Sequence, residues 1–257
     1  MILRGGADVH AAGMNKTIGW VAALLLWAAP AVAGGVVAET VTSGGVERQF
    51  ALYVPDSAKA DGAPMLVLLH GSGGEGSWMI RLWQADADRE GIILVAPNSL
   101  HNDGWRIGPD GPQFVCAAAD DIAGRYHADR RRIYLFGQSG GAVFALHLAM
   151  LESRFFAAAA VHAGAFREAR DFNAVAYATR KTPLAIVIGD KDEYFAMSSV
   201  ANTERVLERA GFPMQVTIVP GMHHYYTRKI APAVNATAWD FLKTHALEDA
   251  PTYVAYH

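Results

Sequence analysis

The sequence predicts an α/β protein built on a mainly parallel, twisted β-sheet with helices on both faces. From Val46 onward, short apolar runs alternate with longer runs that suit a helix, and this alternation is typical of a parallel sheet covered on both sides. Gly91, Gly189 and Gly211 separate such runs where the chain must turn. The chain has 257 residues, of which 52% are hydrophobic, so residues 34–257 are expected to fold as a single domain.

Seven strands are expected from the apolar runs, at residues 48–54, 65–70, 92–96, 132–136, 157–162, 184–188 and 215–219. Five helices are expected between or after them, at residues 77–89, 113–126, 140–151, 198–210 and 231–244. Only about twenty residues separate the fifth strand from the sixth, and this is too little chain for an independent helical lid. We therefore expect no sizeable cap domain over the sheet.

Charge and cysteine content exclude several classes of protein. The net charge is −3 and no run of five like charges occurs, so nucleic acid is not expected as a partner. Cys116 is the single cysteine, which excludes an intrachain disulfide and a thiolate metal cluster. No metal or other cofactor is expected, and no feature of the sequence sets the oligomeric state.

The N-terminal segment has the layout of an export signal. A polar stretch from Met14 precedes an apolar run that starts at Ile18, and the tripeptide AVA ends at Ala33. This order is typical of a secretory signal peptide with an A-x-A cleavage site. We expect residues 1–33 to be a signal peptide, with translation starting at Met14 or with an extended N-terminal region. An uncleaved anchor is the alternative, but Pro30 interrupts the apolar run. The mature protein is therefore expected to be secreted or periplasmic, without stable membrane association.

Residues 131–146 read RRIYLFGQSGGAVFAL, a β-prone run, a glycine-rich turn and a helical stretch. This order of strand, sharp turn and helix is that of a nucleophile elbow, in which a strained backbone exposes the serine hydroxyl. Glycines are needed beside the serine because a β-carbon there would clash with the adjacent strand and helix. Ser139 is the predicted nucleophile.

A serine hydroxyl needs a base, and the base needs an acid that fixes its tautomer. The acid is expected after the strand at 184–188, where the sequence reads GDKDE; we predict Asp192, with Asp190 as the alternative. The base is expected in the loop PGMHH after the last strand; we predict His224, with His223 as the alternative. Adjacent histidines without spaced carboxylates or cysteines make a poor metal site.

An oxyanion hole combines the amide after the nucleophile with an amide from the loop after an early strand. Gly140 supplies the first. The strand at 65–70 opens into HGSGG, whose glycines let backbone amides approach a substrate oxygen closely. Ser72 is the predicted second donor and Gly73 the alternative, and His70 is expected to brace the loop.

The four pieces HGSGG, GQSGG, GDKD and PGMHH occur in one order along the chain. In this respect the chain resembles the α/β-hydrolase superfamily, and within it the secreted polyhydroxybutyrate depolymerase and feruloyl esterase-like carboxylesterases. The resemblance covers residues 46–245 and is also carried by LLHGSGG, DREGIILVAPNS and DRRRIYLFGQSGGA. It departs at His223, where such proteins often carry glycine. It implies an α/β-hydrolase fold and ester hydrolysis through an acyl-enzyme on Ser139, without a cofactor.

The expected activity is that of an exported serine carboxylesterase acting on small or polymeric esters, such as polyester, feruloyl or acetyl-polysaccharide esters. Trp105 and Tyr225 are predicted to bind substrate as part of an aromatic rim that also includes Trp78. A serine peptidase or acyltransferase could use the same three residues, and an exported binding protein that has lost its chemistry is a further alternative.

Overall fold

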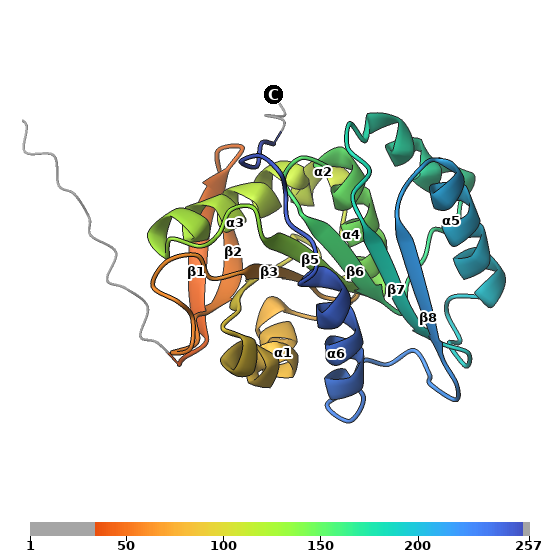
Figure 1. Cartoon of the computed structure of the whole chain (residues 1–257), viewed down its shortest axis with the longest axis horizontal. Coiled ribbons are helices and arrows are strands. Elements are labelled where there is room, and N and C mark those ends of the chain that lie inside the picture. Colours follow the sequence, from red (N-terminus) through yellow and green to blue (C-terminus); the bar gives the residue numbers. More distant parts are fainter. Residues whose placement is uncertain (1–33, 254–257) are drawn as a thin grey trace, which may run out of the picture. The chain divides into compact units, whose positions relative to one another are not determined.

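The computed structural model describes residues 34–253, which form an eight-stranded sheet with helices on both faces (Figure 1). The predicted signal peptide at residues 1–33 lies outside the described residues. The strands are β1 (Val37–Ser43), β2 (Val46–Tyr53), β3 (Met65–Leu69), β4 (Ile93–Pro97), β5 (Ile133–Gln138), β6 (Ala158–His162), β7 (Leu184–Gly189) and β8 (Met214–Val219). The helices are α1 (Gly76–Glu90), α2 (Ile107–Asp110), α3 (Pro112–Arg125), α4 (Gly140–Leu151), the 3₁₀ helix η1 (Ala169–Tyr177), α5 (Met197–Arg209) and α6 (Ala231–Leu242).

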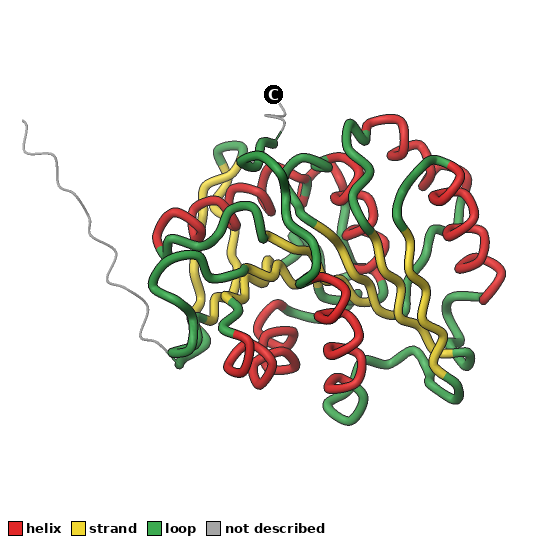
Figure 2. Tube along the Cα trace, in the orientation of Figure 1, coloured by secondary structure: helices red, strands yellow, loops and turns green. Residues whose placement is uncertain are grey.

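The strands, yellow in Figure 2, form one sheet in the order β1-β2-β4-β3-β5-β6-β7-β8. β1 pairs with β2 and β2 with β4 in antiparallel fashion, whereas every pair from β4 through β8 is parallel. β1 and β8 end the sheet, which is therefore open. The predicted mainly parallel sheet with helices on both faces is confirmed.

The sheet separates two apolar cores, as the alternation of side chains along a strand requires. In β3, Met65, Val67 and Leu69 pack on the face covered by α3, α4 and α5. Leu66 and Leu68 pack on the opposite face, against α1 and α6. Because both faces are buried, all five residues of β3 are apolar, and this continuous run made the strand recognisable in the sequence.

All seven predicted strands and all five predicted helices are present, with ends that differ by a few residues. β1 was not predicted. It reads VAETVTS and pairs only with β2, so its residues alternate between half-buried and exposed. An edge strand of this kind lacks the continuous apolar run that marks the central strands.

Between β6 and β7 the structure contains only η1, and residues 34–253 form no sizeable cap domain over the sheet, as expected. Among residues 34–253, no helix combines the length and the apolar character that crossing a membrane requires.

A buried carboxylate organises the loop that follows β4. Asp110 is fully buried and accepts hydrogen bonds from the Arg48 guanidinium at 2.8 Å, from the Leu100 amide at 2.6 Å and from the Arg106 amide at 2.8 Å. Arg48 also donates to the Pro109 carbonyl. A buried ion pair whose remaining groups are hydrogen-bonded resists loss of either partner, because the other charge would be left in an apolar setting.

Asp110→Ala is expected to lower the free energy of unfolding by about 3–5 kcal/mol, since the buried Arg48 loses its counter-charge. Asp103 lies in the same loop but forms an exposed pair with Arg106, so Asp103→Ala should change stability by less than about 1 kcal/mol. Urea unfolding of both variants checks this difference. Equal losses in the two variants would contradict the role given to Asp110.

Candidate active site

Ser139 lies at the turn between β5 and α4 with φ 54° and ψ −117°, a backbone conformation that residues other than glycine rarely adopt. Close packing surrounds this turn. A β-carbon at Gly137 would lie 2.2 Å from the Gly141 carbonyl oxygen, and one at Gly141 would lie 2.2 Å from the Leu69 carbonyl oxygen. Both glycines are therefore required sterically, as the sequence pattern predicted.

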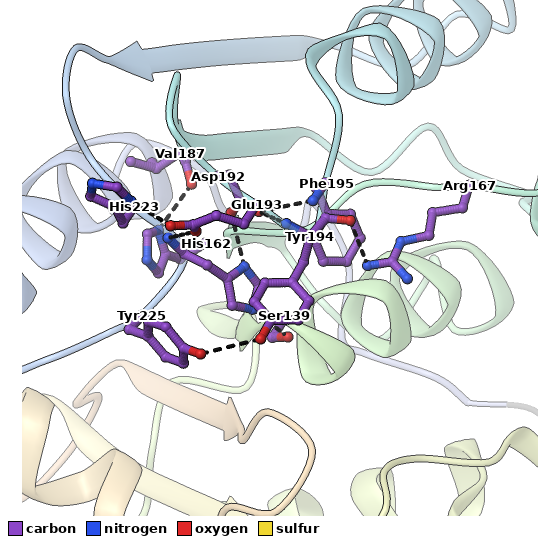
Figure 3. A network of polar contacts seen from close by, with 11 residues as sticks. Ser139, His162, Arg167, Val187, Asp192, Glu193, Tyr194, Phe195, His223 and Tyr225 are labelled. Atoms are coloured by element: carbon purple, nitrogen blue, oxygen red, sulfur yellow. Dashed lines mark hydrogen bonds and ion pairs between the residues drawn. The ribbon is translucent and has the colours of Figure 1, made fainter.

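Ser139 meets the predicted base and acid in a continuous hydrogen-bond relay (Figure 3). The Ser139 hydroxyl donates to His224 Nε2 at 2.9 Å, and His224 Nδ1–H donates to Asp192 Oδ2 at 2.9 Å. The other carboxylate oxygen, Oδ1, accepts the amides of Tyr194 at 2.9 Å and Phe195 at 2.8 Å. The Asp192 side chain is fully buried and that of His224 is 7% exposed. This arrangement fixes the imidazole tautomer, leaving Nε2 able to take a proton from Ser139.

The two alternative residues take other roles in the structure. Asp190 Oδ1 accepts the Gly221 amide at 2.6 Å, so this carboxylate holds the turn before the histidines. His223 is 64% exposed and its Nδ1 lies 2.5 Å from Glu193 Oε1. The structure thus brings Asp192 and His224 to Ser139, and gives Asp190 and His223 other partners.

The predicted oxyanion donors lie close together beside Ser139. A β-carbon on Gly140 would lie 2.9 Å from the Ser72 hydroxyl oxygen and 3.6 Å from the Ser72 amide nitrogen. Within residues 34–253, neither amide has a recorded hydrogen-bond acceptor. The amide of Gly73, the alternative donor, is bonded to the Asn102 carbonyl at 2.7 Å. Ser72 and Gly140 therefore keep the two amides that could receive an oxyanion.

His70 and Trp105 brace the loop that carries Ser72. His70 Nδ1–H donates to the Gly71 carbonyl at 2.8 Å and its Nε2 accepts the Ser99 amide at 3.2 Å. This pattern needs the neutral ring, and burial accordingly lowers the pKa of His70.

The prediction that Trp105 binds substrate is not supported by its position. Its indole N–H donates to the His70 carbonyl at 2.7 Å, and its ring stacks on Phe144 with centroids 4.9 Å apart. Trp105 does not line either of the cavities at Ser139. A tryptophan packed in this way supports the loop that carries Ser72, on the side where the indole contacts His70 and Phe144.

Two cavities border Ser139. The first, of about 500 Å³, is called the Trp78 pocket; it is walled by Trp78, Arg81, Tyr226 and the HGSGG loop. The second, of about 530 Å³, is called the Arg167 pocket; it is walled by Val143, Arg167, Tyr194 and Phe195. Ser72, Ser139, His224 and Tyr225 line both. The predicted position of Tyr225 and Trp78 beside the site is therefore observed.

Tyr194, Glu193 and Arg167 were not predicted as site residues. Tyr194 is 55% exposed, its ring lies 4.5 Å from that of His224, and its hydroxyl is 3.2 Å from the hydroxyl of Tyr225. Arg167 lies over the Phe195 ring and donates to the Tyr194 carbonyl at 3.0 Å. Their positions just after β6 and β7 were the available signal, because the carboxyl ends of parallel strands gather at one edge of the sheet.

An open, mainly parallel sheet with a serine at a strained turn after a central strand defines the α/β-hydrolase class. Residues 115–247 match the Dienelactone hydrolase family, and the chain belongs to this family. Membership of the α/β-hydrolase superfamily, predicted from the four motifs, is thereby confirmed. The narrower likeness to polyhydroxybutyrate depolymerases and feruloyl esterases stays a prediction.

Similar proteins include several esterases. The chain is 29% identical over 149 residues to a protein of Nocardia uniformis subsp. tsuyamanensis named "Putative esterase NocK", a match that covers 52% of this chain and 43% of NocK. It is 31% identical over 107 residues to the bifunctional acetylxylan esterase/xylanase XynS20E of Neocallimastix patriciarum, covering 40% of this chain and 16% of that protein. The chain thus spans less than half the length of both relatives.

Among solved structures, esterase 2 of Thermogutta terrifontis, phosphorylated by paraoxon, matches with a TM-score of 0.67 at 16% identity, covering 82% of this chain and 94% of that one. At this identity the likeness concerns the fold. The family match and the fold thus agree on the α/β-hydrolase class.

His162 is a buried histidine beside the relay. Its carbonyl accepts the Ser139 amide at 3.0 Å, and its Nδ1–H donates to the Val187 carbonyl at 3.0 Å. Its Nε2 is buried without a hydrogen-bond partner among the described residues. Burial, with a further contribution from the nearby His224, lowers the pKa of His162 from 6.5 to about 4.

This pKa predicts a loss of stability in acid. The unfolded chain binds a proton at His162 as the pH falls through 6.5, whereas the folded protein does so only near 4. The stabilisation is complete above pH 6.5 and is lost as the pH falls toward 4, by about 3 kcal/mol. Urea unfolding between pH 7 and pH 4.5 should therefore depend less steeply on pH in His162→Asn, whose amide can still donate to Val187. Identical slopes in the variant and the parent protein would refute this assignment.

Proposed function

We propose that the protein is an exported serine carboxylesterase that works through an acyl-enzyme on Ser139. The observation that carries the proposal is the relay from Ser139 through His224 to the buried Asp192. Beside the serine lie the amides of Ser72 and Gly140, which donate to no backbone carbonyl among residues 34–253. A base within 2.9 Å of the hydroxyl and a satisfied acid behind it are the geometry that nucleophilic catalysis needs.

The reaction would proceed in two halves. In the first, Ser139 Oγ attacks the ester carbonyl carbon while His224 Nε2 takes the hydroxyl proton. The carbonyl oxygen becomes an oxyanion that the amides of Ser72 and Gly140 stabilise. The bond to the leaving alkoxide then breaks and the imidazolium returns its proton to it, so that an alcohol departs and the acyl group stays on Ser139.

In the second half, water replaces the alcohol. His224 takes a proton from the water while the water oxygen adds to the acyl carbon. The bond between that carbon and Ser139 Oγ then breaks, the imidazolium returns the proton to Oγ, and the acid departs. No cofactor takes part in this scheme. Residues 34–257 would carry the whole reaction as one catalytic domain.

Export forms part of the same proposal and rests on the sequence of residues 1–33. Cleavage after Ala33 would give a mature protein that starts at Gly34 and works outside the cytoplasm, in the periplasm or the medium. Sequencing the N-terminus of the exported protein checks whether cleavage occurs after Ala33.

The two pockets favour esters whose acyl and alcohol groups differ in polarity. Aromatic rings of Trp78 and Tyr226 wall one pocket, whereas the charged side chains of Arg167, Glu168 and Asp171 line the other. Such a site suits an ester that joins an aryl or alkyl group to a polar, hydroxylated group. Feruloyl, polyester and acetyl-polysaccharide esters are the candidates, and the acetylxylan esterase named among the relatives is in keeping with the last of these.

Ser139→Ala is expected to lower kcat/KM for ester hydrolysis on the order of a millionfold, because the hydroxyl is the nucleophile. His224→Ala should lose nearly as much, and Asp192→Ala about ten-thousandfold. The matched variants His223→Ala and Asp190→Ala should each lose no more than about tenfold, since neither group touches the reacting atoms. Steady-state assays, with labelling of Ser139 by a fluorophosphonate probe, measure these differences.

Near-normal activity of a folded Ser139→Ala protein would refute the proposal. Absence of both probe labelling and turnover in the parent protein would favour an exported binding protein. Transfer of the acyl group to an added alcohol or amine in preference to water would indicate an acyltransferase, and faster cleavage of peptides than of esters would indicate a peptidase.

Tyr225→Ala tests the substrate class. Loss of an exposed ring at the border of both pockets should raise KM about two- to tenfold for methyl ferulate but not for methyl butyrate. Tyr177 is similarly exposed and lines neither pocket, so Tyr177→Ala is the matched control. Assays of acetylated xylan and polyhydroxybutyrate beside these esters separate the candidates, and an equal effect on both methyl esters would contradict ring recognition by Tyr225.

A further inference from the structure

Two loops that carry the acid and the base lie against each other. The acid loop, residues 189–195, follows β7, and the histidine loop, residues 220–226, follows β8. The Lys191 amide donates to the Met222 carbonyl at 3.1 Å, and a β-carbon at Gly189 would lie only 1.8 Å from that carbonyl oxygen. The loops are therefore in contact where they leave the sheet.

Glu193 extends this contact to the base itself (Figure 3). Its Oε1 accepts from His223 Nδ1 at 2.5 Å, and its Oε2 accepts the backbone amide of His224 at 3.3 Å. One carboxylate thus binds two consecutive residues of the histidine loop. Asp192 holds the ring of His224, and Glu193 holds its backbone.

The charge of Glu193 suits this contact. The hydrogen bond from His223, with smaller effects of nearby amides, lowers the pKa of the Glu193 carboxyl, so it is ionised at neutral pH. A neutral His223 can donate from Nδ1 as well as a protonated one, so the contact exists in both protonation states. The pair is exposed, and an exposed pair contributes little to global stability. We expect the Glu193–His223 pair to affect the position of the histidine loop instead.

We propose that Glu193 is a positioning residue for the base, and that Glu193 and His223 together form a clasp that holds His224 within reach of Ser139. This inference rests on the proposed esterase function. It also gives a role to His223, the position at which the sequence departs from the pattern it resembles. Small displacements of a base cost large factors in rate, which makes such a clasp effective even where it adds little stability.

Glu193→Ala is expected to lower kcat for a short alkyl ester about tenfold, with KM unchanged within about twofold. Glu193→Gln should recover most of the loss, because its amide oxygen can still accept the His224 amide. The rate of fluorophosphonate labelling should fall in parallel with kcat. This rate reports how far Ser139 is activated, independently of how an ester substrate binds in the pockets. Glu208 is an exposed glutamate on α5, and Glu208→Ala is the matched control.

His223→Ala should lose less than Glu193→Ala, and the double variant should lose no more than Glu193→Ala alone, since the two residues act as one unit. Urea unfolding midpoints of all variants should match that of Glu208→Ala.

Ser139→Ala, assayed in parallel, separates this inference from the proposed function. If Ser139→Ala is inactive and Glu193→Ala keeps the kcat and the labelling rate of the parent protein, the clasp is refuted while the esterase function stands. A rise in KM at constant kcat, or a kcat loss that Glu193→Gln does not recover, also overturns the positioning role. An active Ser139→Ala protein overturns the proposed function itself.

Discussion

The backbone of Ser139 is held in a conformation that few residues adopt, and the rest of the site depends on this constraint. Its φ of 54° is maintained because β3, β5 and α4 approach so closely that only glycine fits at positions 137 and 141. The packing of the sheet core thus offsets the energetic cost of the strained turn. In return, the hydroxyl stands clear of its own strand and helix, where a base can reach it.

The base and the acid arrive from distant parts of the chain. His224 is 85 residues from Ser139 in sequence and 32 from Asp192, yet the three side chains meet because β5, β7 and β8 are parallel and end at the same edge. The amides of Tyr194 and Phe195, which donate to Asp192, and the contacts of Glu193 then fix the two loops. The sheet brings these residues close to one another, and hydrogen bonds between the loops set their final positions.

The sequence was sufficient to predict the parallel sheet, because the central strands are apolar on both faces, as β3 illustrates. It was also sufficient to predict that Ser139, Asp192 and His224 lie together, since their motifs follow predictable strand ends. It was not sufficient for β1, whose pattern is that of a half-exposed edge.

Side-chain direction explains the other differences. Trp105 was expected at the substrate, but its indole points to the back of the oxyanion loop, and no local pattern distinguishes these two orientations. Glu193 and Arg167 looked like ordinary polar residues of turns. Their contacts with His224 and Phe195 depend on pairs of loops that come together only in the folded protein.

The shortness of the segment between β6 and β7 bears on the timing of catalysis. In many hydrolytic sites a lid must open before substrate enters or product leaves, and that motion limits turnover. Within residues 34–253, only η1 occupies this segment, and both pockets meet at Ser139 without such an element between them. A substrate that enters either pocket would therefore reach Ser139 without first displacing a lid built from this segment.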